Sequence, residues 1–90
     1  MKQFRSSPEV DASAVGERVV LYHRGTRKSL VLNPSGSHLW EHLESWRTLD
    51  DLAAALLARY PALDRERARR DASAFLAELD EHAMVFAEAG

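Results

Sequence analysis

The sequence predicts an α+β fold, in which an N-terminal antiparallel β-sheet of two or three strands precedes three α-helices. Two observations support this prediction. The first third of the chain contains the segments R-V-V-L-Y-H and S-L-V-L, which are rich in residues favoured in strands. Beyond Asn33-Pro34, apolar residues instead recur three and four positions apart, which is typical of helices with one buried face.

The two strand-like segments are predicted to form a hairpin. Residues 18–23 and 28–33 are its strands, and the sequence R-G-T-R between them supplies a glycine-containing turn. Because side chains alternate along a strand, Val31 faces outward when Leu30 and Leu32 pack inward. The second strand therefore presents one apolar face to the core and one to its surroundings.

The residues before the hairpin give weaker signals. Residues 8–14 are expected to form a short third strand or an extended arm, followed by a turn at Gly16-Glu17. Residues 1–7 are mostly polar, so we expect a flexible N-terminus. Residues 8–90 are then expected to be a single domain, since a chain of 90 residues lies within the usual size of one.

Each expected helix follows a residue that can cap its first turn. Ser35 is expected to cap the first helix, Thr48 the second and Asp64 the third, because hydroxyl and carboxylate oxygens accept hydrogen bonds from free N–H groups. Pro61 ends the second helix. The expected helices cover residues 35–44, 49–60 and 65–82, and residues 84–86 form a last short strand or pack back on the core.

The composition argues against several classes of protein. The net charge is −2 and the pI is about 6.0, so no overall positive field attracts nucleic acid or anionic lipid. There is no cysteine, which excludes disulfides and thiolate metal sites. No segment approaches the ~20 apolar residues of a membrane span, and the N-terminus does not resemble a signal peptide. We expect a cytoplasmic protein without a membrane segment.

Catalytic and metal-binding patterns are weak. His38 and His42 lie four positions apart on one expected helix, but no third ligand stands at a recognisable spacing. Ser35, Ser37 and Ser73 have no evident base partner, and the glycines are too scattered for a phosphate loop. The sequence therefore predicts no catalytic residue, metal or cofactor.

The arginine-rich segment R-E-R-A-R-R-D, residues 65–71, has two interpretations. It could be the recognition helix of a winged helix DNA-binding protein, or a solvated helix face with Glu66–Arg70 and Arg67–Asp71 ion pairs. The interleaved acids and the negative net charge favour the second interpretation, because DNA affinity depends on uncompensated cations. Trp46, in an expected connector, is a candidate contact residue or a lid over the helix junction.

Several short motifs occur in an order that resembles the sequence pattern of a known protein family. They are V-V-L-Y, S-L-V-L-N-P-S-G-x-x-L-W, R-T-L-D-D-L, L-x-x-x-Y-P and D-x-x-x-F-L-x-x-L. The most specific part joins residues 32–40 to Asp71 and Phe75-Leu76. Over about residues 19–85 the chain resembles the PqqD family, small winged helix-turn-helix-like domains also called RiPP recognition elements.

The resemblance implies a non-catalytic function. Family members bind the leader segment of a ribosomally made precursor peptide and deliver it to a modifying enzyme, often a radical SAM protein. It also implies that the leader adds as a strand beside residues 28–33 and packs against the third helix. The chain departs from the family pattern at Ser45-Trp46 and at Ala83, where members often have glycine; at Ala83 this removes a favoured left-handed helix cap.

Strand addition is physically reasonable if residues 28–33 form a sheet edge, because an edge offers unpaired N–H and C=O groups. Backbone pairing gives little net affinity after the leader is ordered, so apolar leader side chains must also be buried. For Leu30, Leu32 and Phe75 the alternative is ordinary core packing, and an exposed edge can also pair two copies into a dimer. The predicted peptide-binding residues are Ser29, Leu30, Val31, Leu32, Asn33, Arg67, Asp71, Ala74, Phe75 and Glu78.

Overall fold

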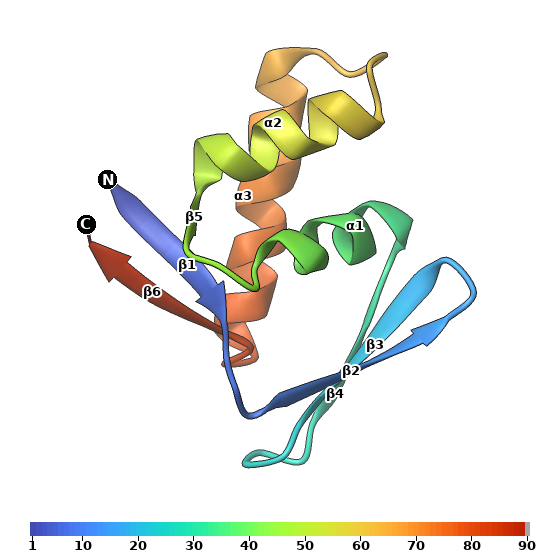
Figure 1. Cartoon of the computed structure of the whole chain (residues 1–90), viewed down its shortest axis with the longest axis vertical. Helices are drawn as coiled ribbons and strands as arrows, with labels where there is room; N and C mark the ends of the chain where they lie inside the picture. The colour runs from blue at the N-terminus through green and yellow to red at the C-terminus, as the bar shows by residue number, and fades with distance from the viewer. Residues whose placement is uncertain (90) are drawn as a thin grey trace.

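The computed structural model describes residues 1–89 and confirms the predicted α+β class. Two three-stranded antiparallel sheets flank a group of three helices (Figure 1). The elements are β1 (Lys2–Ser6), β2 (Val10–Val15), β3 (Arg18–His23), β4 (Ser29–Leu32), α1 (Pro34–His42), β5 (Arg47–Thr48), α2 (Leu49–Arg59), α3 (Arg65–Glu81) and β6 (Val85–Ala89).

The predicted hairpin is the β3–β4 part of one sheet, whose strand order is β2-β3-β4. Leu30 pairs with Leu21 and Leu32 with Val19, so these four side chains share the inner face. The expected third strand is β2, which pairs with β3 through a turn at Gly16, where φ is +64°. Strand β4 pairs with β3 alone and lies at the edge of this sheet.

The expectation of a flexible N-terminus is wrong for most of residues 1–7. Residues 2–6 form β1, the central strand of the second sheet, between β5 and β6. The Ser6 N–H donates to the Leu43 carbonyl (2.9 Å) and the Ser7 N–H to the Met84 carbonyl (2.9 Å), and only 3% of Ser7 is exposed. These partners lie in the middle and near the end of the described chain, so the polar composition of the segment concealed its pairing.

The first helix begins differently from the prediction. Asn33, rather than Ser35, is its N-cap: the Asn33 Oδ1 accepts a hydrogen bond from the Gly36 N–H at 2.7 Å. Pro34 then occupies the first helical position, where its missing N–H costs nothing. The other two caps are confirmed. Thr48 forms a reciprocal capping box with Asp51, and the Asp64 side chain accepts from the Arg67 N–H.

Helix α3 ends in a Schellman motif built on a non-glycine residue. The Met84 N–H donates to the Leu79 carbonyl at 2.8 Å, and the Ala83 N–H donates to the Asp80 carbonyl at 3.1 Å. This geometry requires Ala83 to adopt φ +56°, a conformation that favours glycine. The buried Met84 and Leu79 supply the apolar contact that accompanies such a cap.

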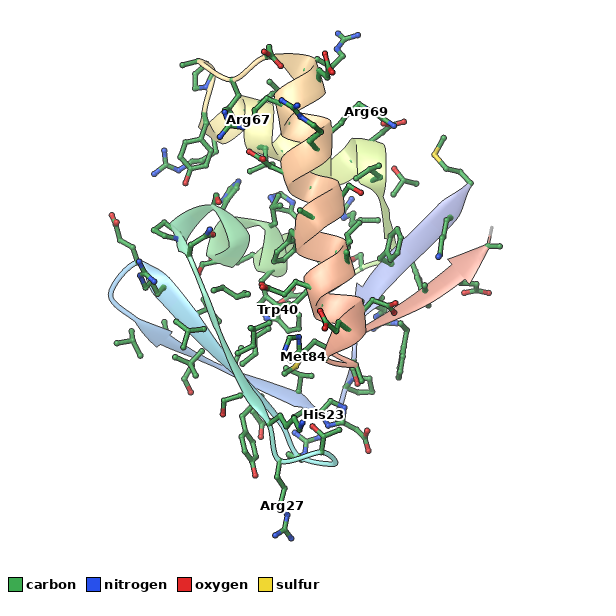
Figure 2. All side chains as sticks on the ribbon, turned by 180° about the vertical axis from the view of Figure 1, so that it is seen from behind. His23, Arg27, Trp40, Arg67, Arg69 and Met84 are labelled. Carbon is green, nitrogen blue, oxygen red and sulfur yellow. The ribbon has the colours of Figure 1, made fainter. Side chains whose placement is uncertain are left out.

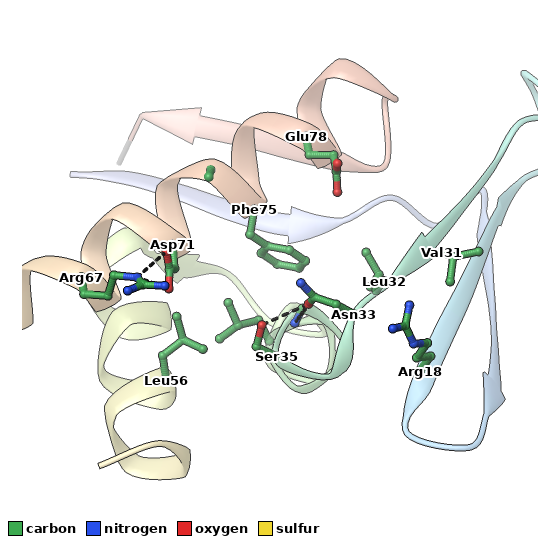
Figure 3. Close-up of a pocket in the computed structure, with 13 residues that line it drawn as sticks. Arg18, Val31, Leu32, Asn33, Ser35, Leu56, Arg67, Asp71, Phe75 and Glu78 are labelled. Atoms are coloured by element: carbon green, nitrogen blue, oxygen red, sulfur yellow. Dashed lines mark hydrogen bonds and ion pairs between the residues drawn. The ribbon is translucent and has the colours of Figure 1, made fainter. Parts of the chain in front are cut away.

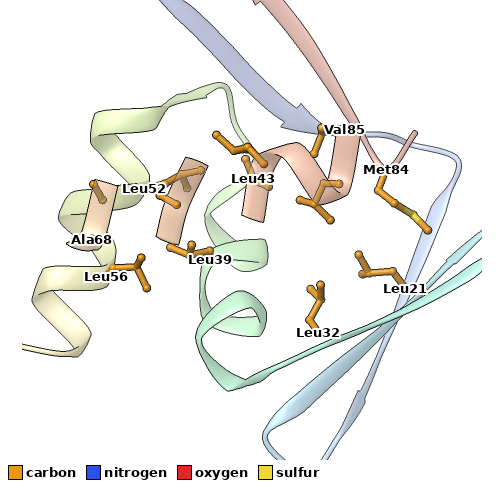
Figure 4. Packing of buried hydrophobic residues seen from close by; sticks show 13 residues of the cluster. Leu21, Leu32, Leu39, Leu43, Leu52, Leu56, Ala68, Met84 and Val85 are labelled. Carbon is orange, nitrogen blue, oxygen red and sulfur yellow. The ribbon is translucent and has the colours of Figure 1, made fainter. Parts of the chain in front are cut away.

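The core lies where the three helices meet the inner face of the β2-β3-β4 sheet (Figure 4). Its members are Leu21, Leu32, Leu39, Leu43, Leu52, Ala53, Leu56, Ala68, Ala72, Leu76, Leu79, Met84 and Val85. Trp40 packs against this cluster while staying partly exposed, and the β3–β4 turn carries Arg27 away from it (Figure 2). Ser37 is buried and joins α1 to the sheet: its Oγ accepts from the Val19 N–H at 2.8 Å.

Candidate functional site

A cleft of about 580 Å³ separates β4 from α3 (Figure 3). One wall is the end of the edge strand, and the other is one face of α3. Residues from the first two turns of α1 and Leu56 of α2 complete the cleft. Of the predicted site residues, eight line it: Val31, Leu32, Asn33, Arg67, Asp71, Ala74, Phe75 and Glu78. Ser29 and Leu30 do not line it.

The free edge of β4 offers backbone groups in a defined pattern. The His23 N–H donates to the Lys28 carbonyl at 2.9 Å, so Lys28 occupies a hydrogen-bonded position opposite β3. Antiparallel pairing alternates, and Leu30 and Leu32 therefore direct their backbone groups toward β3. The N–H and C=O groups of Ser29 and Val31 consequently point away from the sheet. Ser29 belongs to the candidate edge through its backbone even though its side chain lies outside the cleft.

Side chains on β4 separate into core and surface. Leu32 is 2% exposed and belongs to the core, while Leu30 is partly buried against it. Val31 lies on the opposite face and is 55% exposed. For both leucines the structure therefore shows the core packing that sequence reasoning left open, and Leu32 also borders the cleft.

Phe75 covers the base of the cleft because Gly36 lets it approach α1 closely. A Cβ atom at Gly36 would lie 3.3 Å from the Phe75 Cε1 and 3.1 Å from the Asn33 Oδ1. Both distances are shorter than ordinary van der Waals contact, so an added methyl group would displace the ring or the cap. The sequence N-P-S-G thus ends the edge strand, caps α1 and admits the aromatic ring.

Most of the charged side chains that line the cleft come from α3. Arg67 and Asp71 form an ion pair one turn apart on α3, with the Arg67 Nε 3.3 Å from the Asp71 Oδ2. Arg69, on the far side of the same helix, pairs with Asp50. Two of the arginines that suggested a DNA-recognition helix are therefore compensated, which weakens that alternative.

Sequence reasoning missed five lining residues: Arg18, Ser35, Gly36, Leu39 and Leu56. One signal was available for Arg18. The hairpin register pairs Val19 with Leu32, which places Arg18 beside Asn33 at the end of the edge strand. No comparable signal existed for Leu56, because its position depends on how α2 packs across α1.

Outside the cleft, residues 1–89 offer few groups suited to metal binding. The His38 and His42 rings contact edge to face with centroids 5.1 Å apart. Within residues 1–89, no three His, Asp or Glu side chains gather closely enough to hold a metal ion. No helix in the same range combines the length and apolar character needed to cross a membrane.

Comparison with known families matches this architecture. The family model described as coenzyme PQQ synthesis protein D (PqqD) matches residues 18–85, a range that contains both walls of the cleft. The chain belongs to the PqqD family. The resemblance inferred from the ordered motifs is thereby confirmed. No curated protein matches this PqqD family member.

Two solved structures are similar over nearly the whole chain. One is described as TbiB1 in complex with the TbiA(beta) leader peptide; it is 28% identical, has a TM-score of 0.84, and the match covers 96% of this chain and 99% of that one. The other is described as lasso peptide synthetase B1 complexed with the leader peptide, with 24% identity, a TM-score of 0.77 and coverage of 92% and 96%. At 24% identity, the similarity to this second structure is one of fold alone.

Proposed function

We propose that this PqqD family member binds the leader segment of a ribosomally synthesised precursor peptide as an added strand on β4. The bound leader lies against α3 and is presented to an enzyme that modifies the precursor. The observation that carries the proposal is the unpaired edge of β4 bordering the cleft. The similar TbiB1 structure contains a leader peptide, which supports the same class of ligand here.

The energetics require both the edge and the cleft. The edge offers the N–H and C=O groups of Ser29 and Val31 and the N–H of Asn33, each contributing about 0.5–1.5 kcal/mol net when paired. Ordering a flexible peptide costs about 2–5 kcal/mol, so backbone pairing alone leaves little affinity. An apolar leader side chain buried against Phe75 and Leu39 would add about 1.5–3 kcal/mol. Tight binding therefore depends on leader side chains entering the cleft.

In this function the chain recognises the precursor peptide, and the partner enzyme performs the chemistry. The cleft is lined by backbone edge, apolar side chains and ion-paired groups, which can hold and orient a peptide. A modifying enzyme, such as a radical SAM protein, would then act on the part of the precursor beyond the bound segment. The resulting gain is local concentration and orientation of the substrate.

The test uses the leader encoded by a short open reading frame beside the gene for this chain. Fluorescence anisotropy with the labelled leader should show saturable binding at or below about 10 μM. Amide hydrogen exchange then locates the contact. Binding should protect the N–H groups of Val31 and Asn33, while Leu30, already bonded to β3, changes little. Absence of binding, or protection confined to another strand, would refute the proposal.

A further inference from the structure

Two charged side chains at the mouth of the cleft have no ion-pair or hydrogen-bond partner among residues 1–89. They are Arg18, at the start of β3, and Glu78, on α3. The other charged lining residues, Arg67 and Asp71, are paired with each other. Arg18 and Glu78 are therefore the charges of the cleft that are available to a ligand.

These two side chains approach β4 from opposite sides. Arg18 precedes the inward-facing Val19, so its side chain belongs to the outer face of the sheet, together with Val31. Glu78 projects from α3, which covers the inner side. Figure 3 shows both side chains directed toward the end of β4, with the strand between them.

An added strand would expose its alternate side chains to these two charges separately. Every second residue of the peptide would face α3, and the residues between them would face outward, because the side-chain period of a strand is two. A basic side chain on the inner face meets Glu78, and an acidic side chain on the outer face meets Arg18. A charge pair in the opposite arrangement meets like charge at both positions.

We propose that Arg18 and Glu78 select leaders by charge register. The preferred leader carries a basic residue facing Glu78 and an acidic residue facing Arg18, separated by an odd number of positions. This inference rests on the proposed strand addition and deepens it by naming the ligand chemistry. Apolar burial supplies affinity, and the two charges choose the face and register in which the peptide enters.

The expected contribution of each charge is modest, because both side chains are at the solvent-exposed mouth. An exposed ion pair changes the dissociation constant by about two- to fivefold. Replacing an attractive charge by a repulsive one doubles this change on the logarithmic scale, to about four- to 25-fold. The preference should weaken as salt concentration rises, since exposed charges are screened.

The test is selection of peptides from a randomised display library on the purified full chain, which needs no known leader. The wild-type chain should enrich peptides with a basic and an acidic residue at odd separation. Glu78→Lys should replace the enriched basic residue by an acidic one, and Arg18→Glu should replace the acidic residue by a basic one. The milder variants Glu78→Gln and Arg18→Gln should remove each preference without inverting it.

Two matched controls carry the same charge changes away from the cleft. Asp80→Lys lies on the far side of α3, near β1, and Arg65→Glu lies at the start of that helix. Neither should alter the enriched charge pattern. Circular dichroism of every variant confirms that selection was made on folded protein.

The outcomes separate this inference from the proposed function. Enriched peptides that protect the Val31 amide from exchange but show no charge register would overturn the charge-selection inference and leave strand addition intact. A control variant that shifts the pattern as strongly as Glu78→Lys would also overturn it, because a general field would then be responsible. A library that yields no binding peptide would contradict the proposed function itself.

Discussion

Val31→Pro separates strand addition from every other use of the cleft. The Val31 N–H points away from β3, so proline at this position removes no hydrogen bond from the existing sheet. The side chain is 55% exposed on the outer face, and proline is tolerated on edge strands. The variant should therefore fold, while its ring occupies the position at which a leader carbonyl would accept a hydrogen bond.

The expected loss of leader affinity follows from the hydrogen bonds that the Val31→Pro substitution prevents. A leader carbonyl left without its donor in the cleft costs about 1–3 kcal/mol. The proline ring also pushes the added strand away from the Val31 carbonyl, which removes a second bond of about 1 kcal/mol. The sum of about 2–4 kcal/mol weakens the dissociation constant by roughly 30- to 1,000-fold.

The matched control is Ala12→Pro, on the other edge of the same sheet. The Arg24 N–H donates to the Glu9 carbonyl at 2.9 Å, so alternation directs the Ala12 N–H away from β3 as well. Fluorescence anisotropy with labelled leader should give wild-type affinity for Ala12→Pro and a large loss for Val31→Pro. Equal affinities for the two variants, with both folded by circular dichroism, would refute addition at β4.

Three further substitutions test how the site is supported. Ala83→Gly should raise the free energy of unfolding by about 1 kcal/mol in urea denaturation, because glycine adopts the positive φ of the α3 cap without strain. Ser37→Ala should lower the free energy of unfolding by about 1–3 kcal/mol, since the Val19 N–H loses its acceptor. Gly36→Ala should lower the same quantity by about 1–3 kcal/mol and weaken leader binding, because the added methyl group displaces Phe75.

Controls for these substitutions lie on exposed parts of α3. Ala77→Gly occurs in the interior of that helix, where glycine costs about 1 kcal/mol, so it should change stability in the direction opposite to Ala83→Gly. Ser73→Ala removes an exposed hydroxyl and should change the free energy of unfolding by less than about 0.5 kcal/mol. Agreement between either control and its test variant would contradict the local explanation.

Sequence reasoning succeeded where the cause of structure was local. Thr48 and Asp64 were identifiable as caps because the interacting groups lie within one helical turn. The cap at Asn33 was missed in favour of Ser35, although the following proline places Asn33 just outside the helix. The pairing of residues 2–6 could not be inferred, because its partners are some 40 and 80 residues away and the segment itself is polar.

The residues of the candidate site likewise divide into those predictable from local sequence and those placed by distant packing. Val31, Asp71 and Glu78 were predictable from strand alternation, helical spacing and the family pattern. The hairpin register places Arg18 at the end of the edge strand, but its approach to the cleft depends on how the hairpin packs against α3. The position of Leu56 depends on the packing of α2. A sequence can indicate which face of an element is used; the depth and outline of the cleft come from three-dimensional packing.

The pairing of β1 with β6 has a consequence for protein engineering. Lys2 is the register partner of Ala89, so the two ends of the described chain lie side by side, and neither strand lines the cleft (Figure 1). A host protein could carry this unit as an insert within one of its surface loops, joined through two short linkers, without blocking ligand access. Such chimaeras would add the proposed peptide-binding domain to an unrelated enzyme.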